Sequence, residues 1–310
     1  MAENRRLFAN QRGAACRKMP LRVKLAPFAL AVPIPREQVD PSGSAHAVRG
    51  EAVVQGWNRK FWVLALAGLL AACAAPKPVS APVALADVTR FSTGKPGEVL
   101  PGAWQPWTLS KMKKPTAYRL VQDGGKTVIS AKADASASGL IHPLANLDPR
   151  VYEQLSWRWK VDNLIRGADN TRRSREDSPV RLVVTFGGDL EKLDFGDKLF
   201  YAQVKAITGQ QMPYATLMYI WENRAQKEEV IANGHSARIK MLVAESGRDK
   251  VGRWQEVKRN LYEDYKRAFG EEPGPITAIG IMTDTDNTGE QAHAWYGDIS
   301  LRKLDAVAVH

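Results

Sequence analysis

Apolar and polar residues alternate along much of the chain beyond residue 117, as in β-strands that bury only one face. The clearest run covers residues 156–162, where Trp157, Trp159 and Val161 alternate with polar or charged side chains. Further runs of this kind occupy residues 118–122, 127–133, 139–143, 181–186, 216–222, 237–243, 276–283 and 292–301. Turns rich in Gly and Asn separate many of them. The pattern predicts an all-β domain, a β-sandwich or jelly roll.

One segment shows a helical period instead. Val257, Leu261, Tyr265 and Phe269 recur every four residues, charged residues fill most of the intervening positions, and Gly270 follows as a stop signal. The spacing predicts one amphipathic helix over residues 255–269, packed on the sandwich. A weaker helical pattern covers residues 197–208.

A short apolar run precedes the predicted domain. Residues 61–72 are mostly apolar, follow Arg59 and Lys60, and end in Leu-Ala-Ala before Cys73. The run is too short for a transmembrane helix, which needs about 20 apolar residues, but it has the length of a secretory signal. Residues 70–73, Leu-Ala-Ala-Cys, resemble the lipobox of bacterial lipoproteins, in which the cysteine is acylated. This resemblance implies a signal peptide over residues 53–72, a membrane anchor at Cys73 and, because Ala74 is not Asp, an outer-membrane lipoprotein facing the periplasm.

The segment ahead of this signal changes the interpretation of the net charge. Residues 1–72 hold 11 Lys and Arg against 4 Asp and Glu, which accounts for +7 of the total of +11. We interpret residues 1–52 as a mis-assigned start or a disordered basic extension, with the true start near Val53 or Val54. The remaining chain is only weakly basic, so its charge does not indicate a nucleic-acid partner.

The rest of the chain predicts one domain on a tether. Residues 73–86 are rich in Pro and Ala and predict an extended tether, residues 87–304 a single β-sandwich domain, and residues 305–310 a tail. Cys16 and Cys73 are the two cysteines of the chain, so the domain has no internal disulfide. We expect a monomer.

Several motifs together resemble a bacterial family, the domain of unknown function 3047. They occur in the same order here, at residues 155–161, 175–181, 219–221, 252–254, 259–265, 269–270 and 284–289. The resemblance spans nearly the whole predicted domain. It implies an exported protein and a sandwich similar to galactose-binding and other carbohydrate-binding modules, but no reaction.

Basic residues predict one possible binding face. If the strands at 156–162, 181–186 and 237–243 are neighbours, alternation places their cations on one sheet face. Such a face could bind an anionic or polyhydroxyl ligand, or it could simply be solvated. Its residues are Arg158, Lys160, Arg181, Arg238 and Lys240.

Aromatic residues give a second candidate. Trp157 and Trp159 share a side with Val161, which indicates core packing. Tyr219 and Trp221 alternate with Met218 and Ile220, and we interpret the aromatic pair as a candidate ligand platform.

The turn at residues 284–290 predicts either a hairpin turn or a cation site. Asp284, Asp286 and Asn287 offer oxygen ligands of the kind that Ca²⁺ prefers. Position twelve counted from Asp284 is Trp295, so the segment is not an EF-hand. Hydrogen bonds of Asx side chains within a turn explain the same residues.

The remaining candidates come from an Arg-rich loop and a family motif. Asp177 and Arg181 could pair at a pocket rim beside the loop at 166–177, or form an ordinary surface ion pair. Arg259 and Asp264 lie in the motif at 259–265 and complete the candidate ligand-binding residues.

The sequence carries none of the common catalytic signatures, such as GxSxG, HExxH or a P-loop. The first hypothesis is therefore a non-catalytic envelope protein that binds a glycan or another envelope component, without a cofactor apart from possible Ca²⁺. A hydrolase of envelope polysaccharide that uses a metal or two carboxylates is the alternative. A structural partner in an envelope complex is the third.

Overall fold

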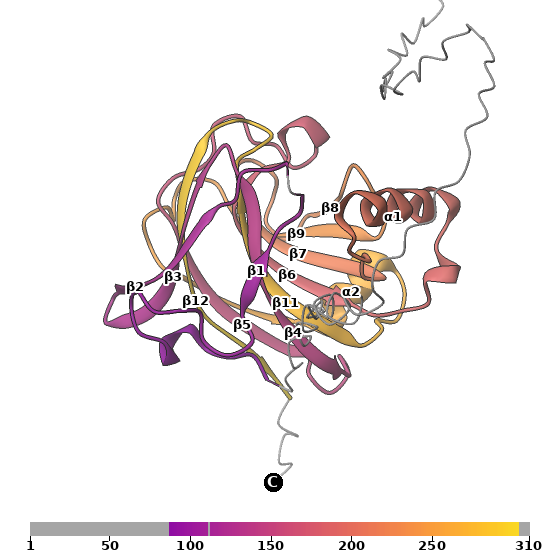
Figure 1. Cartoon of the computed structure of the whole chain (residues 1–310), viewed down its shortest axis with the longest axis horizontal. Coiled ribbons are helices and arrows are strands. Elements are labelled where there is room, and N and C mark those ends of the chain that lie inside the picture. The colour runs from indigo at the N-terminus through magenta and orange to yellow at the C-terminus, as the bar shows by residue number, and fades with distance from the viewer. Residues whose placement is uncertain (1–86, 111, 304–310) are drawn as a thin grey trace, which may run out of the picture. The chain divides into compact units, whose positions relative to one another are not determined.

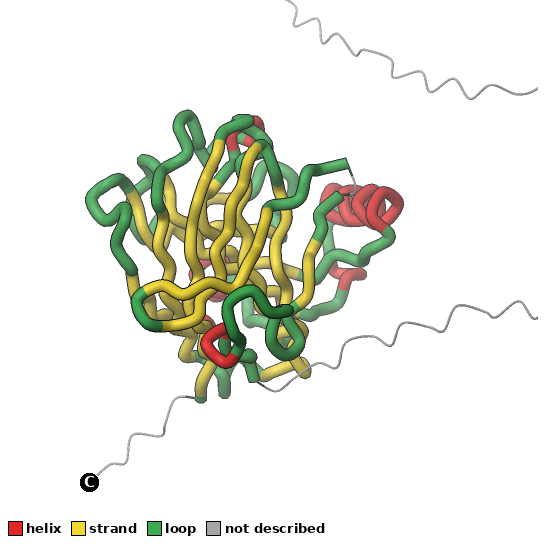
Figure 2. Tube along the Cα trace, turned by 60° about the vertical axis from the view of Figure 1, so that its left-hand side comes forward, coloured by secondary structure: helices red, strands yellow, loops and turns green. Residues whose placement is uncertain are grey.

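The computed structural model describes residues 87–110 and 112–303, which form a sandwich of two β-sheets (Figure 1, Figure 2). The prediction of an all-β sandwich is therefore confirmed. The predicted signal peptide, the lipid anchor at Cys73, the tether and the tail at 305–310 lie outside the described residues.

The first sheet has seven strands. Their spatial order is β1 (Gln105–Trp107), β4 (Ala137–Leu147), β11 (Ile276–Asp284), β6 (Ser178–Phe186), β7 (Ala215–Glu222), β9 (Ile239–Ser246) and β8 (Val230–Ala232). Neighbouring strands are antiparallel except β7 and β9, which are parallel.

The second sheet has five antiparallel strands. Their order is β10 (Gln255–Asn260), β5 (Gln154–Val161), β12 (Gln291–Arg302), β3 (Lys126–Asp134) and β2 (Ala117–Asp123). Each of the nine stretches expected from alternation contains a strand, and β1, β8 and β10 are additional.

Within residues 87–110 and 112–303, two α-helices accompany the sheets, with short 3₁₀ turns at η1 (Phe91–Thr93), η2 (Arg173–Arg175) and η3 (Leu190–Lys192). Helix α1 (Phe195–Thr208) begins after Asp194, whose carboxylate accepts a hydrogen bond from the amide of Asp197. Its 14 residues make it the longest helix in the described part of the chain, where no helix is long and apolar enough to cross a membrane.

The predicted helix over residues 255–269 is wrong in its first six residues. Those residues form β10, which pairs with β5 from Gln255 opposite Trp159 to Asn260 opposite Gln154. Helix α2 (Leu261–Phe269) starts only where the Asn260 side chain caps the amide of Glu263. The four-residue repeat misled the prediction because Val257 also packs against the core as a strand residue.

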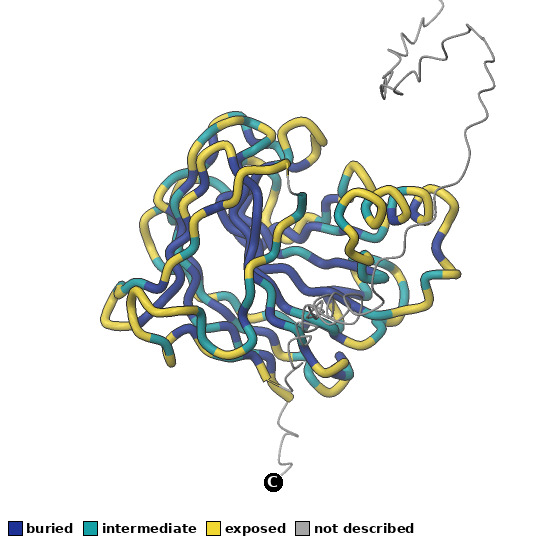
Figure 3. The backbone as a smooth tube through the Cα atoms, viewed as in Figure 1, coloured by how far each residue is buried: buried dark blue, intermediate teal, exposed yellow. Residues whose placement is uncertain are grey.

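The core lies between the inner faces of the two sheets. Figure 3 shows the central strands β6 and β7 of the seven-stranded sheet almost entirely in the dark blue of buried residues. Trp157 and Trp159 are buried there as predicted, and the ring centroids of Trp157 and Tyr219 lie 4.9 Å apart across the sandwich. Leu182, Val184 and Phe186 of β6 also face inward. Alternation therefore turns Arg181, Val183 and Thr185 to the outer face of the seven-stranded sheet.

Candidate functional site

A groove of about 770 Å³ lies over this outer face. Its floor is made by outward-facing residues of the central strands, including Thr185, Met218 and Met282. Helix α1 and the segment after it contribute Phe200, Val204, Thr208 and residues 210–213, and β1 with the following segment contributes Gln105, Trp107, Leu109 and Lys113. Glu176, Asn233, His235, Asp286 and Asn287 make its polar end.

Trp107 is the aromatic residue that β1 brings to the groove. It pairs in register with Gly139 of β4, and its half-buried side chain packs against Ala137, Val183 and Met282. A Cβ atom at position 139 would lie 2.9 Å from Cε3 of Trp107. Glycine at this position therefore lets the indole lie close to the sheet.

Arg181 is buried at the polar end of the floor. Its Nε donates to Oδ1 of Asp284 at 2.9 Å, and its Nη2 donates to Oδ2 at 3.1 Å. Nη2 also donates to the carbonyl of Glu176 at 2.9 Å. Burial alone would lower the pKa of Arg181, but the charges of Asp284 and Glu176 outweigh it and hold the pKa above its ordinary value. The guanidinium is therefore a fixed positive charge inside the sheet.

Glu176 lines the groove beside this pair. Only 12% of its side chain is exposed, and both carboxylate oxygens accept from Nδ2 of Asn233, at 2.7 and 2.9 Å. Burial raises the pKa of Glu176, against the opposing charge of Arg181, and the charge of Asp284 adds to the rise.

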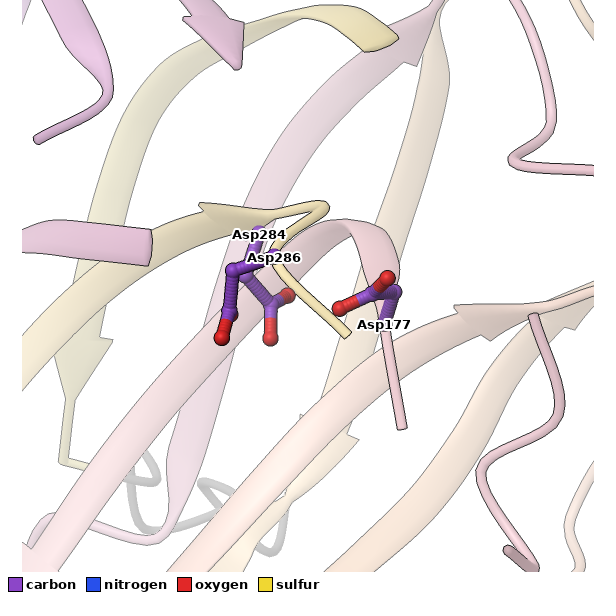
Figure 4. Close-up of side chains that lie close together, drawn as sticks. All are labelled: Asp177, Asp284 and Asp286. Atoms are coloured by element: carbon purple, nitrogen blue, oxygen red, sulfur yellow. The ribbon is translucent and has the colours of Figure 1, made fainter. Parts of the chain in front are cut away.

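The carboxylates of Asp177, Asp284 and Asp286 cluster at this end, with one oxygen of each within 4.8 Å of the others (Figure 4). Each already has protein partners. Asp177 accepts from the amides of Asn287 and Thr288, at 3.2 and 2.7 Å, while Asp286 pairs with Lys113. The carboxylate that binds the amides of the turn is thus that of Asp177, which lies outside the turn, and Ca²⁺ binding remains the alternative hypothesis from the sequence.

The predicted pair of Asp177 and Arg181 is not formed. Asp177 binds the turn that follows β11, and Arg181 binds Asp284. The sequence prediction missed that Asp284, and not Asp177, pairs with Arg181, because Asp177 and Asp284 are more than a hundred residues apart.

The predicted basic face does not form either. Arg158 and Lys160 lie on β5 of the five-stranded sheet, whereas Arg181 belongs to the other sheet. Arg238 precedes β9 and pairs with Glu271 at 2.5 Å. The expectation failed because β5 is not a neighbour of β6 or β9.

The predicted platform of Tyr219 and Trp221 is wrong, because both side chains are fully buried in the core. The Tyr219 hydroxyl donates to Oδ2 of Asp264 at 2.9 Å. Met218 and Ile220 take the outward positions on β7, and Met218 lines the groove. The aromatic residues of β7 therefore face the core and the aliphatic ones face outward, which is the reverse of the expected arrangement.

Arg259 and Asp264 lie away from the groove. Arg259 donates to both oxygens of Asp264, each at 2.7 Å, and to both oxygens of Glu228, at 2.7 and 2.9 Å. These bonds tie β10 and α2 to the turn after β7, which is a structural role.

The sequence prediction also missed the groove residues Trp107, Phe200, Met212 and Met282. Alternation on β6 could have pointed to the correct face, because it turns Arg181 and Thr185 away from Leu182 and Val184. No local signal places α1 or β1 beside that face.

The profile of a family described as "Protein of unknown function (DUF3047)" matches residues 102–300. No curated protein matches the sequence.

Solved structures similar to the chain include two carbohydrate-binding modules of Clostridium thermocellum. The family 11 module of the cellulosomal cellulase Lic26A-Cel5E is 10% identical with a TM-score of 0.36, over 72% of this chain and 97% of that one. The family 30 module of the cellulosomal cellulase Cel9D-Cel44B is 12% identical with a TM-score of 0.33, over 71% and 98%. The K2 cleaved adhesin domain of Lys-gingipain is 11% identical with a TM-score of 0.33, over 71% and 99%.

Proposed function

The chain belongs to the DUF3047 family of proteins of unknown function, and from its own residues we propose that its groove binds a glycan of the cell envelope. In this proposal Cys73 carries a lipid anchor in the outer membrane, and the domain faces the periplasm. The observation that carries the binding proposal is the combination of Trp107 with uncharged polar side chains along one groove.

The lining of the groove suits a sugar chain. Trp107 and Phe200 offer aromatic surface for the apolar face of a sugar ring, and methionines add further apolar contact. Amide and hydroxyl groups that can bind sugar hydroxyls surround them. They come from Gln105, Gln210, Gln211, Asn233, Asn287, Thr185, Thr208, Thr216 and Thr277.

Charge favours a neutral ligand over an anionic one. The Lys and Arg side chains among the described lining residues are Lys113 and Arg181, and both are paired with carboxylates. Neither is free to bind an anion, so the groove is selective for uncharged sugar units.

The anchor proposal rests on the sequence that precedes the domain. The basic pair and the short apolar run occur in the order of a secretory signal, and Cys73 follows them in a quartet that resembles a lipobox. Intact mass of the membrane-extracted protein tests it, with an acylated chain beginning at Cys73 as the expected species. A mature chain that keeps residues 1–72 would refute the anchor.

Glycan binding is tested with the full chain on a glycan array, followed by calorimetry with the strongest ligand. Trp107→Ala should weaken binding by about tenfold or more, because a central aromatic contact is lost. Trp295→Ala is the matched control, since Trp295 lies on the other sheet, where it contacts Lys160 and His293. Equal effects of both substitutions, or no glycan bound by the wild type, would exclude the proposal.

Glu176 supports a second candidate, a carboxylate-based glycoside hydrolase on the same groove. Its raised pKa suits a general acid, and Asp286 offers a second carboxylate at the same end. Hydrolysis of the bound glycan should fall at least about 100-fold in Glu176→Gln while binding persists. Glu191→Gln, which changes an exposed residue of η3, is the control. A wild-type chain that binds the glycan without cleaving it would exclude this candidate.

A further inference from the structure

Two adjoining clefts lie at the end of the domain where the described chain begins and ends. Their volumes are about 330 and 490 Å³, and both are lined by Arg90, Ser300 and Arg302. Asp87 and Lys303, the first and last described residues, line the second cleft. Figure 1 shows the indigo start and the yellow end of the ribbon together at the lower edge of the sandwich.

The clefts are rich in cations. Six cationic side chains line them, and three carboxylates, from Asp87, Glu256 and Asp298, accompany them. The cations are Arg90, Lys126, Arg158, Lys258, Arg302 and Lys303. We call these six residues the basic end.

The positive charges of the basic end are not neutralised by ion pairs within the described part of the chain. None of the six forms an ion pair with a carboxylate of residues 87–110 or 112–303, whereas fifteen other cationic side chains there do. Asp298 is engaged by Ser92, whose amide and hydroxyl donate to it at 2.9 and 2.6 Å. The clefts therefore keep an excess of free positive charge.

Strand register arranges hydroxyl groups beside these cations. Ser156 of β5 lies opposite Lys258 of β10 on one side and opposite Ser300 of β12 on the other. The three residues form a row across the outer face of the five-stranded sheet. Lysine and serine in such a row can donate to the oxygens of one anionic group.

Arg158 is held in place next to this row. Its guanidinium carbon lies 4.4 Å from the ring centroid of Trp254. Gly297 leaves room for the side chain, because an added Cβ atom would lie 2.4 Å from Cγ of Arg158. An arginine fixed in this way loses little freedom when it binds an oxyanion.

From these observations we propose that the basic end docks the domain on an anionic phospholipid surface, with the phosphates of lipid headgroups in the two clefts. The proposal deepens the proposed function and rests on its lipid anchor. Thirteen residues lie between Cys73 and Asp87, so a chain anchored at Cys73 holds the cleft residue Asp87 within about 50 Å of the membrane. Free cations around the point where the chain enters the domain match an anionic surface in charge.

The test measures flotation of the full chain with vesicles of phosphatidylcholine, with and without phosphatidylglycerol. Cys73→Ser removes the acylation site from every variant, so the result does not depend on the anchor, which the intact-mass measurement tests separately. Lys126→Gln combined with Lys258→Gln should weaken binding to the anionic vesicles about 25-fold, or about fivefold for each charge. Both side chains are exposed, and thermal melting checks that the fold is kept.

Lys205→Gln combined with Arg224→Gln is the matched control, because it removes two exposed cations away from the clefts. Residues 1–86 are the same in every variant, so their contribution to vesicle binding cancels when the variants are compared. Equal losses in the two double variants, or equal binding to both vesicle types, would overturn the proposal. Release of the wild type by millimolar inorganic phosphate would assign the clefts to a soluble phosphate ligand and would also overturn it.

Discussion

The guanidinium of Arg181 holds both carboxylate oxygens of Asp284 at the polar end of the groove, at 2.9 and 3.1 Å. Only 2% of the Arg181 side chain and 7% of the Asp284 side chain are exposed. The pair joins β6 to β11 and positions Glu176, whose carbonyl accepts from the same guanidinium. A structural ion pair thus shapes one wall of the candidate site.

Removing this guanidinium should destabilise the fold strongly. Arg181→Met leaves Asp284 buried without its partner, which costs about 3–5 kcal/mol in the free energy of unfolding. Chemical denaturation measures the change. Arg150→Met is the control, because Arg150 pairs with Asp148 on the surface, and we expect no measurable change there. Similar losses of unfolding free energy in the two variants would show that the buried pair of Arg181 and Asp284 contributes no more to stability than a surface pair.

Gly139 should be required for the position of Trp107. In Gly139→Ala the new methyl group would lie 2.5 Å from the carbonyl oxygen of Ile281 and 2.9 Å from Cε3 of Trp107. We expect a loss of about 1–3 kcal/mol in the free energy of unfolding, together with weaker glycan binding, because strand and indole must both shift.

Gly196→Ala is the matched control for this substitution. Its added methyl group meets only the Asp194 carboxylate at 3.3 Å, in the first turn of α1. Position 196 is exposed and the Asp194 carboxylate has to move by only a few tenths of an ångström, so stability should stay within about 0.5 kcal/mol of the wild type. Unchanged stability and glycan binding in Gly139→Ala would contradict the role given to Gly139.

The sequence predicts the strands of this fold better than its site. Alternation is a local property, so it located β5, β6 and the other long strands, together with the buried Trp157. Which strands are neighbours depends on contacts between distant residues, and this is why Arg158 and Arg181 were expected on one face. The choice between Tyr219 and Met218 as the outward residue also depends on the opposite sheet, because Tyr219 faces inward to contact Trp157 and Asp264.

Calcium should not stabilise the protein through the acidic turn. The carboxylate of Asp284 already binds Arg181, that of Asp177 binds the amides of the turn, and Asp286 pairs with Lys113. A cation would have to displace these partners, so we expect no rise in melting temperature at millimolar Ca²⁺. A rise with Ca²⁺ that is absent in Asp286→Asn would instead favour the cation site, which is the second of the two alternatives given by the sequence.

Acid stability should depend on Glu228, which receives hydrogen bonds from Arg259 at 2.7 and 2.9 Å and from Arg267 at 3.0 Å. The bonds from Arg259 come first among the causes that lower the pKa of Glu228 to about 2, from an ordinary value of 4.5. Because the folded state prefers the ionised form, this group contributes stability above about pH 4.5. The contribution is lost as the pH falls from 4.5 towards 2.

Glu228→Gln should therefore lower stability at neutral pH and flatten the fall in unfolding free energy between about pH 4.5 and 2. Denaturation curves recorded across this range measure the slope. Glu256→Gln is the control, since Glu256 is an exposed strand residue without an ion pair among the described residues. If the unfolding free energy of Glu228→Gln falls as steeply with decreasing pH as that of the wild type, the contacts of Glu228 with Arg259 and Arg267 do not stabilise the folded state.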